Sequence, residues 1–341
     1  MLIIMRPDFS EAQCLRVEDA VRAMGYQPVR VPGAGRTAVC VTGNRGPVDD
    51  SYISRLPGVA HCHRITKPFK LVSRDSHPTD TVIRIGDVVI GEGDPVLVAG
   101  PGSIETEART LAVARAVRRA GAGIFRARLW SERIGPYEFA GVGDEGLHTL
   151  REVREELGIA VIAEVVDPRS AERVAEIVDA VQIPARHMEN EPLFEAAAGL
   201  ARPVILDRGP AATVEEWLMA AERLLARGQR EVILCERGIR AMGHRRTLLD
   251  LHAVPVVRQI SHLPVLVDPS RAVAERGRVR PLARAALAVG ASGLLLEVHT
   301  TPDTAYTDPK QTVDVPTFTG IVEDLAVMRG LTPLSPAPPP T

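Results

Sequence analysis

Short apolar runs and amphipathic segments alternate along most of the chain. Runs rich in valine, isoleucine and leucine begin near Val96, Gly123, Ala160, Ala180, Pro203, Glu231, Pro264 and Ser292. The segments between them repeat apolar residues with helical spacing, as in Glu105–Ala120, Asp144–Leu157, Pro168–Val178 and Thr213–Arg227. Eight near-equal strand–helix units predict an α/β fold, a (β/α)8 TIM barrel over residues 95–328. A doubly wound sheet is the alternative, but the equal spacing favours closure of the sheet.

The first 66 residues follow a different pattern of shorter and more varied segments. Apolar Leu2–Met5 precedes helical spacing over residues 10–24, where Ser10 is the expected N-cap and Gly25 the expected stop. Further strands are expected at Gln27–Val31, Ala38–Thr42 and Val59–Ile65, and a second helix at Val48–Leu56. The resulting βαββαβ order predicts a small ferredoxin-like α+β domain.

Two further segments complete the domain organisation. Residues 67–94 are expected to form a linker and a β-hairpin, Thr81–Gly93, with Gly86 and Asp87 at its turn. Residues 329–341 contain five prolines and no periodic pattern. That composition predicts a disordered tail.

Composition and charge exclude several classes of protein. The 341 residues are 45% hydrophobic and 25% charged, with a formal net charge of −2, so a nucleic-acid or membrane partner recruited by bulk charge is not expected. No apolar run is long enough to cross a bilayer, and the N-terminus lacks a signal-peptide pattern. The four cysteines form no CxxC pair. We therefore expect a soluble, cytoplasmic protein. Imine chemistry in the main domain would rest on Lys310, because no lysine occurs between residues 71 and 309.

Charged residues recur where the predicted barrel strands end, which is where TIM barrels carry their chemistry. These segments are Ala99–Gly102, Arg126, Glu164, Arg186, Asp207–Arg208, Glu236–Arg237, Asp268 and Glu297. Converging arginines would bind a phosphate or carboxylate, and the carboxylates among them could hold a cation or move protons. The alternative is a rim of mutually satisfied ion pairs without a ligand.

The same segments resemble the class Iβ 3-deoxy-D-arabino-heptulosonate 7-phosphate (DAHP) synthases. The matching motifs lie at Ser73–Pro78, Ala99–Glu105, Arg133–Tyr137, Ala163–Pro168, Gln182–Met188, Ile233–Ile239, Leu263–Ser270 and Glu297–His299. The resemblance implies the barrel with its ferredoxin-like domain, which in the family commonly senses aromatic products, so we expect residues 1–66 to have a regulatory or assembly role. It also implies condensation of phosphoenolpyruvate with erythrose 4-phosphate at a divalent metal, in a homodimer or homotetramer.

The resemblance carries over only part of the family's anion site. Arg126, Arg186 and Arg237 match the arginines that bind phosphoenolpyruvate, and Arg133 matches the arginine that contacts the phosphate of the aldose. The threonine beside that last arginine is Ile134 here. Two lysines that hold and protonate phosphoenolpyruvate are replaced, by Ser131 and Asp207. Exchange of an ammonium for a carboxylate changes the local charge by about two units.

The metal site implied by the resemblance is also altered. Glu297 and Asp308 match two ligands, whereas the cysteine position is Gly102 and the histidine position is Arg271. Two carboxylates make a weak transition-metal site. We therefore expect no cofactor, with a weak divalent-cation site at Glu297 and Asp308 as the alternative. The Arg271 guanidinium is expected to take the place of the cation or only to neutralise the two acids.

New ionisable groups at the mouth suggest other chemistry. We name Arg271, Asp207, Glu132 and His187 as candidate catalytic residues; Glu189 is a further new acid. Three functions follow. The first, which we favour, is a repurposed enzyme that binds an anionic enol or keto acid and performs metal-independent aldol-type or proton-transfer chemistry in a specialised aromatic or natural-product pathway. The second is an authentic DAHP synthase, and the third is a non-catalytic regulatory homologue.

Overall fold

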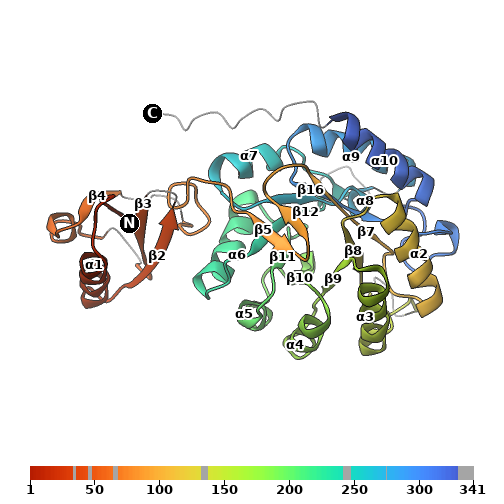
Figure 1. The fold of residues 1–341 in the computed structure, drawn as a ribbon, viewed down its shortest axis with the longest axis horizontal. Helices are drawn as coiled ribbons and strands as arrows, with labels where there is room; N and C mark the ends of the chain where they lie inside the picture. Colours follow the sequence, from red (N-terminus) through yellow and green to blue (C-terminus); the bar gives the residue numbers. More distant parts are fainter. Residues whose placement is uncertain are drawn as a thin grey trace. The chain divides into compact units, whose positions relative to one another are not determined.

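The computed structural model describes residues 1–33, 36–44, 48–63, 68–131, 137–240, 247–273 and 275–328. The chain divides into two compact units (Figure 1). One consists of the described residues of Met1–Asp80 together with Ile260–His262, and the other of the described residues of Thr81–Gln259 and from Leu263 onward. The expected tail, residues 329–341, lies outside the described residues. In the described part of the chain, no helix is long and apolar enough to span a membrane.

The described residues of the first unit form a four-stranded antiparallel sheet with one α-helix, and the strand order β2-β3-β1-β4 is that of a ferredoxin-like fold. Its elements are β1 (Leu2–Met5), α1 (Glu11–Ala23), β2 (Gln27–Gly33), β3 (Arg36–Thr42), the 3-10 turn η1 (Ile53–Arg55) and β4 (Val59–His63). Ser10 caps α1 in a capping box with Gln13, and Gly25 follows the helix at φ +81°. The predicted domain and its first helix are confirmed.

The second helix predicted for this domain is wrong. Only Ile53–Arg55 of the segment Val48–Leu56 is helical, as a single 3-10 turn. Two local features explain the difference. The Asp49 carboxylate accepts a hydrogen bond from Ser51 N at 3.0 Å, which competes with helical pairing. Leu56 is extended because Pro57 follows it.

Eight parallel strands close into a barrel in the second unit, and each begins within one residue of its predicted start. The strands are β7 (Val96–Gly100), β8 (Ile124–Ala127), β9 (Ala160–Glu164), β10 (Ala180–Ile183), β11 (Val204–Asp207), β12 (Val232–Glu236), β15 (Val265–Val267) and β16 (Gly293–Glu297). Pairing of β16 with β7 completes the circle. The predicted TIM barrel is therefore confirmed, and the doubly wound alternative is excluded.

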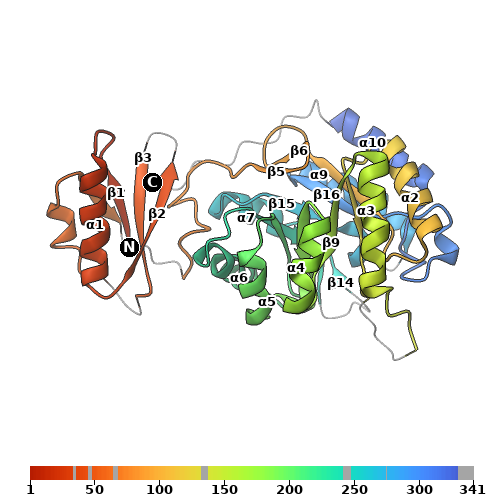
Figure 2. The same cartoon turned by 60° about the horizontal axis from the view of Figure 1, so that its bottom comes forward.

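Helices surround the strands (Figures 1 and 2). They are α2 (Glu107–Ala120), α3 (Gly146–Leu157), α4 (Pro168–Ile177), α5 (Glu191–Gly199), α6 (Val214–Ala226), α7 (Ala253–Ile260), the short α8 (Pro269–Ala272), α9 (Val279–Ala288) and α10 (Val315–Met328). Four of them match the predicted segments to within two residues at either end. A two-residue ladder, β13 (Ile239–Arg240) with β14 (Thr247–Leu248), follows β12.

A hairpin closes the amino-terminal end of the barrel. It consists of β5 (Ile83–Ile85) and β6 (Val88–Ile90), and it packs Ile83, Ile85 and Ile90 into one buried cluster with side chains of all eight barrel strands. Gly86 turns the hairpin at φ +57°. A Cβ on Gly86 would lie 2.9 Å from the Cβ of Ala160, so the turn lies against the barrel. The opposite end of the barrel, where the strands finish, is the end at which TIM barrels carry their active sites.

Candidate active site at the barrel mouth

Carboxylates and guanidiniums occupy the carboxyl ends of the barrel strands, as predicted. Glu164, Asp207, Glu236, Asp268 and Glu297 come from five different strand ends, and each is at most 2% exposed. Buried charges need partners, because removing a charge from water costs several kcal/mol (about 3–5 kcal/mol when one partner of a buried pair is deleted). The partners here are arginines, so the mouth of the barrel is a network of buried ion pairs.

Glu297 lies at the centre of this network, where three guanidiniums surround it. Its Oε1 is 3.5 Å from Arg126 Nη1, 3.4 Å from Arg128 Nη2 and 3.7 Å from Arg271 Nη1. Gln311 Nε2 donates to the other oxygen at 3.1 Å. Burial alone would raise the pKa of this carboxyl, but the three arginines outweigh it and lower the pKa to about 2. Glu297 is therefore a fixed anion.

Asp308 supplies the second acid of this cluster from the loop that follows the short η5 helix (Pro302–Thr304). Its Oδ2 is 2.5 Å from Arg271 Nη1 and 3.5 Å from Arg128 Nη2. Among the described residues, Asp308 is the only non-glycine with a positive φ, at 49°. This left-handed turn is an uncommon backbone conformation, tolerated by aspartate. It lies in the loop that brings the carboxylate to the two arginines.

The four positions that the resemblance assigned to a metal do lie together. Arg271 contacts Glu297 and Asp308, and a Cβ built on Gly102 would be 3.7 Å from the Glu297 carboxyl carbon. That Cβ would also lie 2.6 Å from Thr307 Oγ1 and 3.2 Å from Arg128 Nη2, while Arg128 Nε donates to the Gly102 carbonyl. The residues present do not fit a divalent cation, because the two acids are already bridged by guanidiniums and Gly102 offers no side-chain donor.

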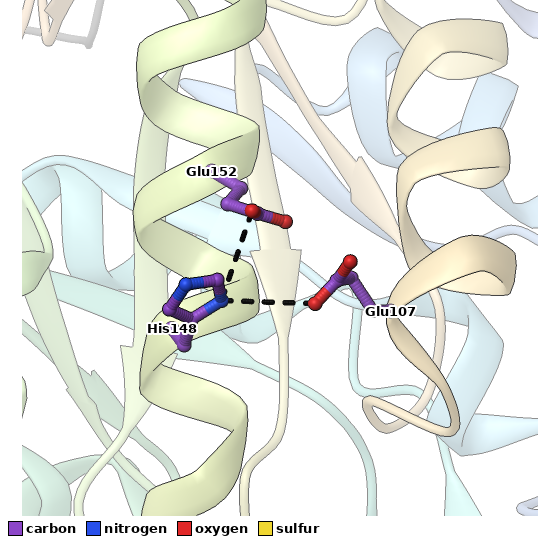
Figure 3. Close-up of side chains that lie close together, drawn as sticks. All are labelled: Glu107, His148 and Glu152. Atoms are coloured by element: carbon purple, nitrogen blue, oxygen red, sulfur yellow. Dashed lines mark ion pairs between the residues drawn. The ribbon is translucent and has the colours of Figure 1, made fainter.

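One group of three metal-ligating side chains does occur among the described residues, but it lies elsewhere. Glu107, His148 and Glu152 bring one ligand atom each to within 4.8 Å of one another (Figure 3). His148 Nδ1 is 3.6 Å from Glu107 and 3.8 Å from Glu152, and its side chain is 66% exposed. These residues come from α2 and α3 on the outside of the barrel. Exposed groups of this kind are common, so we assign this trio no function.

Asp207, a predicted catalytic residue, is held in a buried ion pair. Its Oδ2 is 2.5 Å from Arg237 Nη1, and Gln182 Nε2 donates to Oδ1 at 2.8 Å. Arg208 forms a neighbouring pair, with Nη1 2.8 Å from both Glu236 and Asp250. The Arg237 guanidinium is therefore already paired with the Asp207 carboxylate before any ligand binds.

Asp268 is a buried acid whose two carboxylate oxygens differ in their hydrogen bonding. Its Oδ1 accepts from the Arg271 amide at 3.1 Å and caps α8, whereas Oδ2 has no hydrogen-bond partner among the described residues. Burial raises its pKa to about 6, with the Glu297 charge acting in the same direction and the Arg237, Arg126 and Arg271 charges opposing it. A carboxyl that titrates in this range can hold or release a proton near neutral pH.

Of the remaining predicted residues, some have other surroundings and some lie outside the described residues. Arg186 and His187 lie in the 3-10 turn η3 (Ala185–His187), where the Arg186 residue is exposed and His187 Nδ1 lies 3.1 Å from Asn190 Nδ2. Glu189 is exposed next to them. Ser131, at one of the lysine positions, shares a 2.6 Å hydrogen bond with Ser103. Glu132, Arg133 and Ile134 lie outside the described residues.

Arg128 is a member of this cluster that the sequence analysis did not identify. It is 1% exposed, two positions after Arg126, and contacts both acids of the Glu297 cluster. The signal was present: side chains two apart on a strand point to the same side, so an inward Arg126 predicts an inward Arg128. Gln311 was also missed, because its contact with Glu297 depends on the path of a loop.

Comparisons with known proteins agree with this fold. The DAHP synthetase I family matches residues 53–329, and the DAHP synthase ferredoxin-like domain matches residues 1–67. The chain is 38% identical over 326 residues to a phospho-2-dehydro-3-deoxyheptonate aldolase of Thermotoga maritima, covering 95% of this chain and 96% of the relative. It is 31% identical to a 2-dehydro-3-deoxyphosphooctonate aldolase of Syntrophotalea carbinolica, covering 66% of this chain and 88% of the relative.

Solved structures from Thermotoga maritima show the same architecture. The crystal structure of a phospho-2-dehydro-3-deoxyheptonate aldolase (DAHP synthase) matches with a TM-score of 0.76 and 36% identity over 97% of each chain. A truncated form of 3-deoxy-D-arabino-heptulosonate 7-phosphate synthase matches with a TM-score of 0.71 and 40% identity, over 77% of this chain and 97% of that one. Sequence, fold and both matched regions lead to one conclusion: this chain is a member of the DAHP synthetase I family that carries the family's ferredoxin-like domain.

Proposed function

We propose that the chain is an enzyme that binds a small anionic enol or keto acid, such as phosphoenolpyruvate, at the mouth of its barrel. It performs an aldol-type C–C bond formation or a proton transfer there without a divalent cation. The main observation in support of this proposal is that Arg128 and Arg271 both bridge the Glu297 and Asp308 carboxylates. Relatives named as aldolases support the reaction class.

Arg126 is the arginine best suited to receive the anion. Its two contacts with carboxylates, to Glu164 and Glu297, are both 3.5 Å long, and its Nε has no hydrogen-bond partner among the described residues. A guanidinium with spare donors at a buried position favours a carboxylate or phosphate ligand strongly. Arg237 is less free to respond, because Asp207 holds it at 2.5 Å.

Asp268 is the group we propose for proton transfer. Asp207 is an ion-paired carboxylate, whereas Asp268 combines a raised pKa, about 6, with an oxygen that lacks a hydrogen-bond partner among the described residues. A general acid or base works best when its pKa lies near the working pH. The Asp268 carboxyl meets this condition, and it lies close enough to Arg126 and Arg237, which would hold the substrate, for their charges to act on its pKa.

An authentic DAHP synthase is the second candidate. The observation in its favour is the length of the match, because the Thermotoga maritima relative is covered over 96% of its chain and both domains are matched. This reading requires the paired guanidiniums to do what the divalent cation does in the family. It also places the reaction in aromatic biosynthesis, whereas the first reading leaves the true aldehyde partner open.

Phosphoenolpyruvate binding by the chelator-treated protein tests the proposal. Calorimetry should detect binding by the native chain and a loss of about 10- to 100-fold in affinity in Arg126→Gln, because charged hydrogen bonds contribute about 1.5–3 kcal/mol. Arg126→Lys keeps the charge and should lose less. The matched control is Arg115→Gln, which breaks an exposed ion pair with Glu156 on the outer helices. Binding that needs added Mn²⁺, or that Arg126→Gln leaves unchanged, would contradict the proposal.

A further inference from the structure

Two carboxylate oxygens at the barrel mouth share the same two cationic neighbours. Glu297 Oε1 and Asp308 Oδ2 are both within 3.5 Å of Arg128 Nη2. Both are also within 3.7 Å of Arg271 Nη1. Each guanidinium therefore bridges the pair of oxygens, which is the geometric task of a metal ion that takes both carboxylates as ligands.

The charges balance in the same way. Glu297 and Asp308 carry two negative charges, and Arg128 with Arg271 supplies two positive ones, as one divalent cation would. A third guanidinium, Arg126, lies 3.5 Å from Glu297 and also 3.5 Å from Glu164, whose negative charge it balances. Adding a divalent cation to this cluster would place two further positive charges beside three guanidiniums in a buried site, where like charges repel strongly.

Side-chain atoms of Arg128 and Thr307 also fill the space beside Gly102. The Arg128 guanidinium donates through Nε to the Gly102 carbonyl, and its Nη2 would lie 3.2 Å from any Cβ at position 102. Thr307 Oγ1 would lie 2.6 Å from the same Cβ. A cysteine at position 102 would therefore meet Arg128 and Thr307 before it could meet an ion.

We propose that Arg128 and Arg271 act as a pair that permanently replaces a divalent cation at the mouth, and that Arg128 is the member that blocks its return. This inference deepens the proposed function and uses from it only the assignment of the mouth as the binding site. Arg128 is a positioning residue here: it fixes Glu297 and Asp308 and, together with Arg271, balances their two negative charges without a metal.

The inference predicts which substitutions are needed to restore a metal site at the barrel mouth. Gly102→Cys with Arg271→His rebuilds a full set of metal-ligating side chains but leaves the Arg128 guanidinium in their midst. Only the addition of Arg128→Ala removes the second bridging charge and the guanidinium beside position 102, whereas Thr307 is common to both variants, so the comparison isolates Arg128. We therefore expect the triple variant to bind Mn²⁺, and the double variant to bind it at least tenfold more weakly.

Mn²⁺ binding, measured by calorimetry and by electron paramagnetic resonance in the absence of substrate, tests this predicted difference between the double and triple variants. All proteins carry His148→Ala, which removes the surface trio of Glu107, His148 and Glu152 as a competing site (Figure 3). We expect one Mn²⁺ per chain in the triple variant and none at the mouth of the parent. Circular dichroism establishes that each variant is folded. A failure of the proposed function would appear in phosphoenolpyruvate binding and would leave these Mn²⁺ results unchanged.

Three results would overturn the inference. One is Mn²⁺ binding by the parent that Glu297→Gln abolishes, and this measurement does not depend on whether the triple variant folds. Another is equal affinity in the double and triple variants, which would remove Arg128 from the account. The last is a folded triple variant that binds no Mn²⁺.

Discussion

Glu297 is the residue on which the ion-pair network of this barrel is centred. It keeps the end of β16 and a fully buried position, and Arg126, Arg128 and Arg271 surround its carboxylate. A buried carboxylate with this many cationic neighbours stays ionised, so its pKa is lowered to about 2 despite burial. The cluster depends on this one negative charge.

Replacing that charge tests the cluster at the level of stability. Glu297→Gln keeps the shape of the side chain but leaves the guanidiniums without their shared anion, so we expect the free energy of unfolding to fall by about 3–5 kcal/mol. Urea unfolding followed by circular dichroism measures it. Glu156→Gln removes an exposed partner of Arg115 and should have little effect. Equal stabilities of the two variants would contradict the role given to Glu297.

The pH dependence of stability should carry the signature of Asp268. Its folded-state pKa, about 6, lies above the ordinary value of 3.8, so the folded protein keeps a proton that the unfolded chain releases. The stability that this proton contributes is complete below pH 4 and is lost as the pH rises towards 6. Glu297 acts in the opposite direction only at lower pH, because its pKa of about 2 matters below its ordinary 4.5.

Asp268→Asn should therefore flatten the decline in unfolding free energy between pH 4 and 6, measured by urea titrations across that range. Asparagine can still accept the Arg271 amide hydrogen bond that caps α8. Asp324→Asn is the control, since Arg280 lowers the pKa of that carboxyl and its contribution lies below pH 4. A slope that survives in Asp268→Asn would show that another group is responsible.

At the scale of elements, strands and helices with a regular apolar pattern were predictable. A helix lost to a side-chain hydrogen bond and a following proline was not. The eight barrel strands were found from runs of apolar residues because a strand covered on one side by helices and on the other by the core must be apolar throughout. Val48–Leu56 misled the same approach: apolar spacing suggested a helix, but the Asp49 side chain and Pro57 end the helical pairing locally.

The hairpin at the closed end of the barrel offers a test of packing. Gly86→Ala would place a Cβ 2.9 Å from Ala160 Cβ in a turn at φ +57°, so we expect a loss of about 1–3 kcal/mol in unfolding free energy. Gly277→Ala is the matched control, because nothing lies within 4 Å of its Cβ and its φ is ordinary. Thermal unfolding of the two variants compares them. A Gly86→Ala protein as stable as the control would show that the turn does not close the barrel as described.

At the scale of the whole molecule, the two units have separate buried cores. Ile3, Val17, Val39 and Ile53 belong to the core of the ferredoxin-like domain, whereas the barrel core is built from its own strands and hairpin. Deletion of residues 1–66 should therefore leave a barrel that unfolds cooperatively, with residues 68–80 still bonded to 260–262 through contacts such as Arg74 N to Ile260 O at 3.1 Å. Calorimetry of the shortened chain measures this. Aggregation without a thermal transition would assign the small domain a structural role.

The site was only partly predictable from the sequence, for a physical reason. Residues at strand ends, such as Glu164, Asp207 and Glu297, could be located because strand periodicity fixes where they point. The partners that decide their chemistry come from loops and short turns: Asp308 from a left-handed turn, Gln311 from the same loop and Arg271 from α8. Sequence spacing does not fix the path of a loop. The family resemblance had placed Arg271 beside Glu297 and Asp308, whereas the contact of Arg128 with the same two acids was recognised only in the structure.

Heptulosonate formation from phosphoenolpyruvate and erythrose 4-phosphate, measured with added Mn²⁺ and again after chelation, tests the central claim that this barrel works without a divalent cation. The account predicts that chelation makes no difference: either product forms at the same rate in both conditions, or none forms and the substrate is another anionic acid. Product that appears with Mn²⁺ and vanishes on chelation would contradict the account and make this chain a metal-dependent synthase.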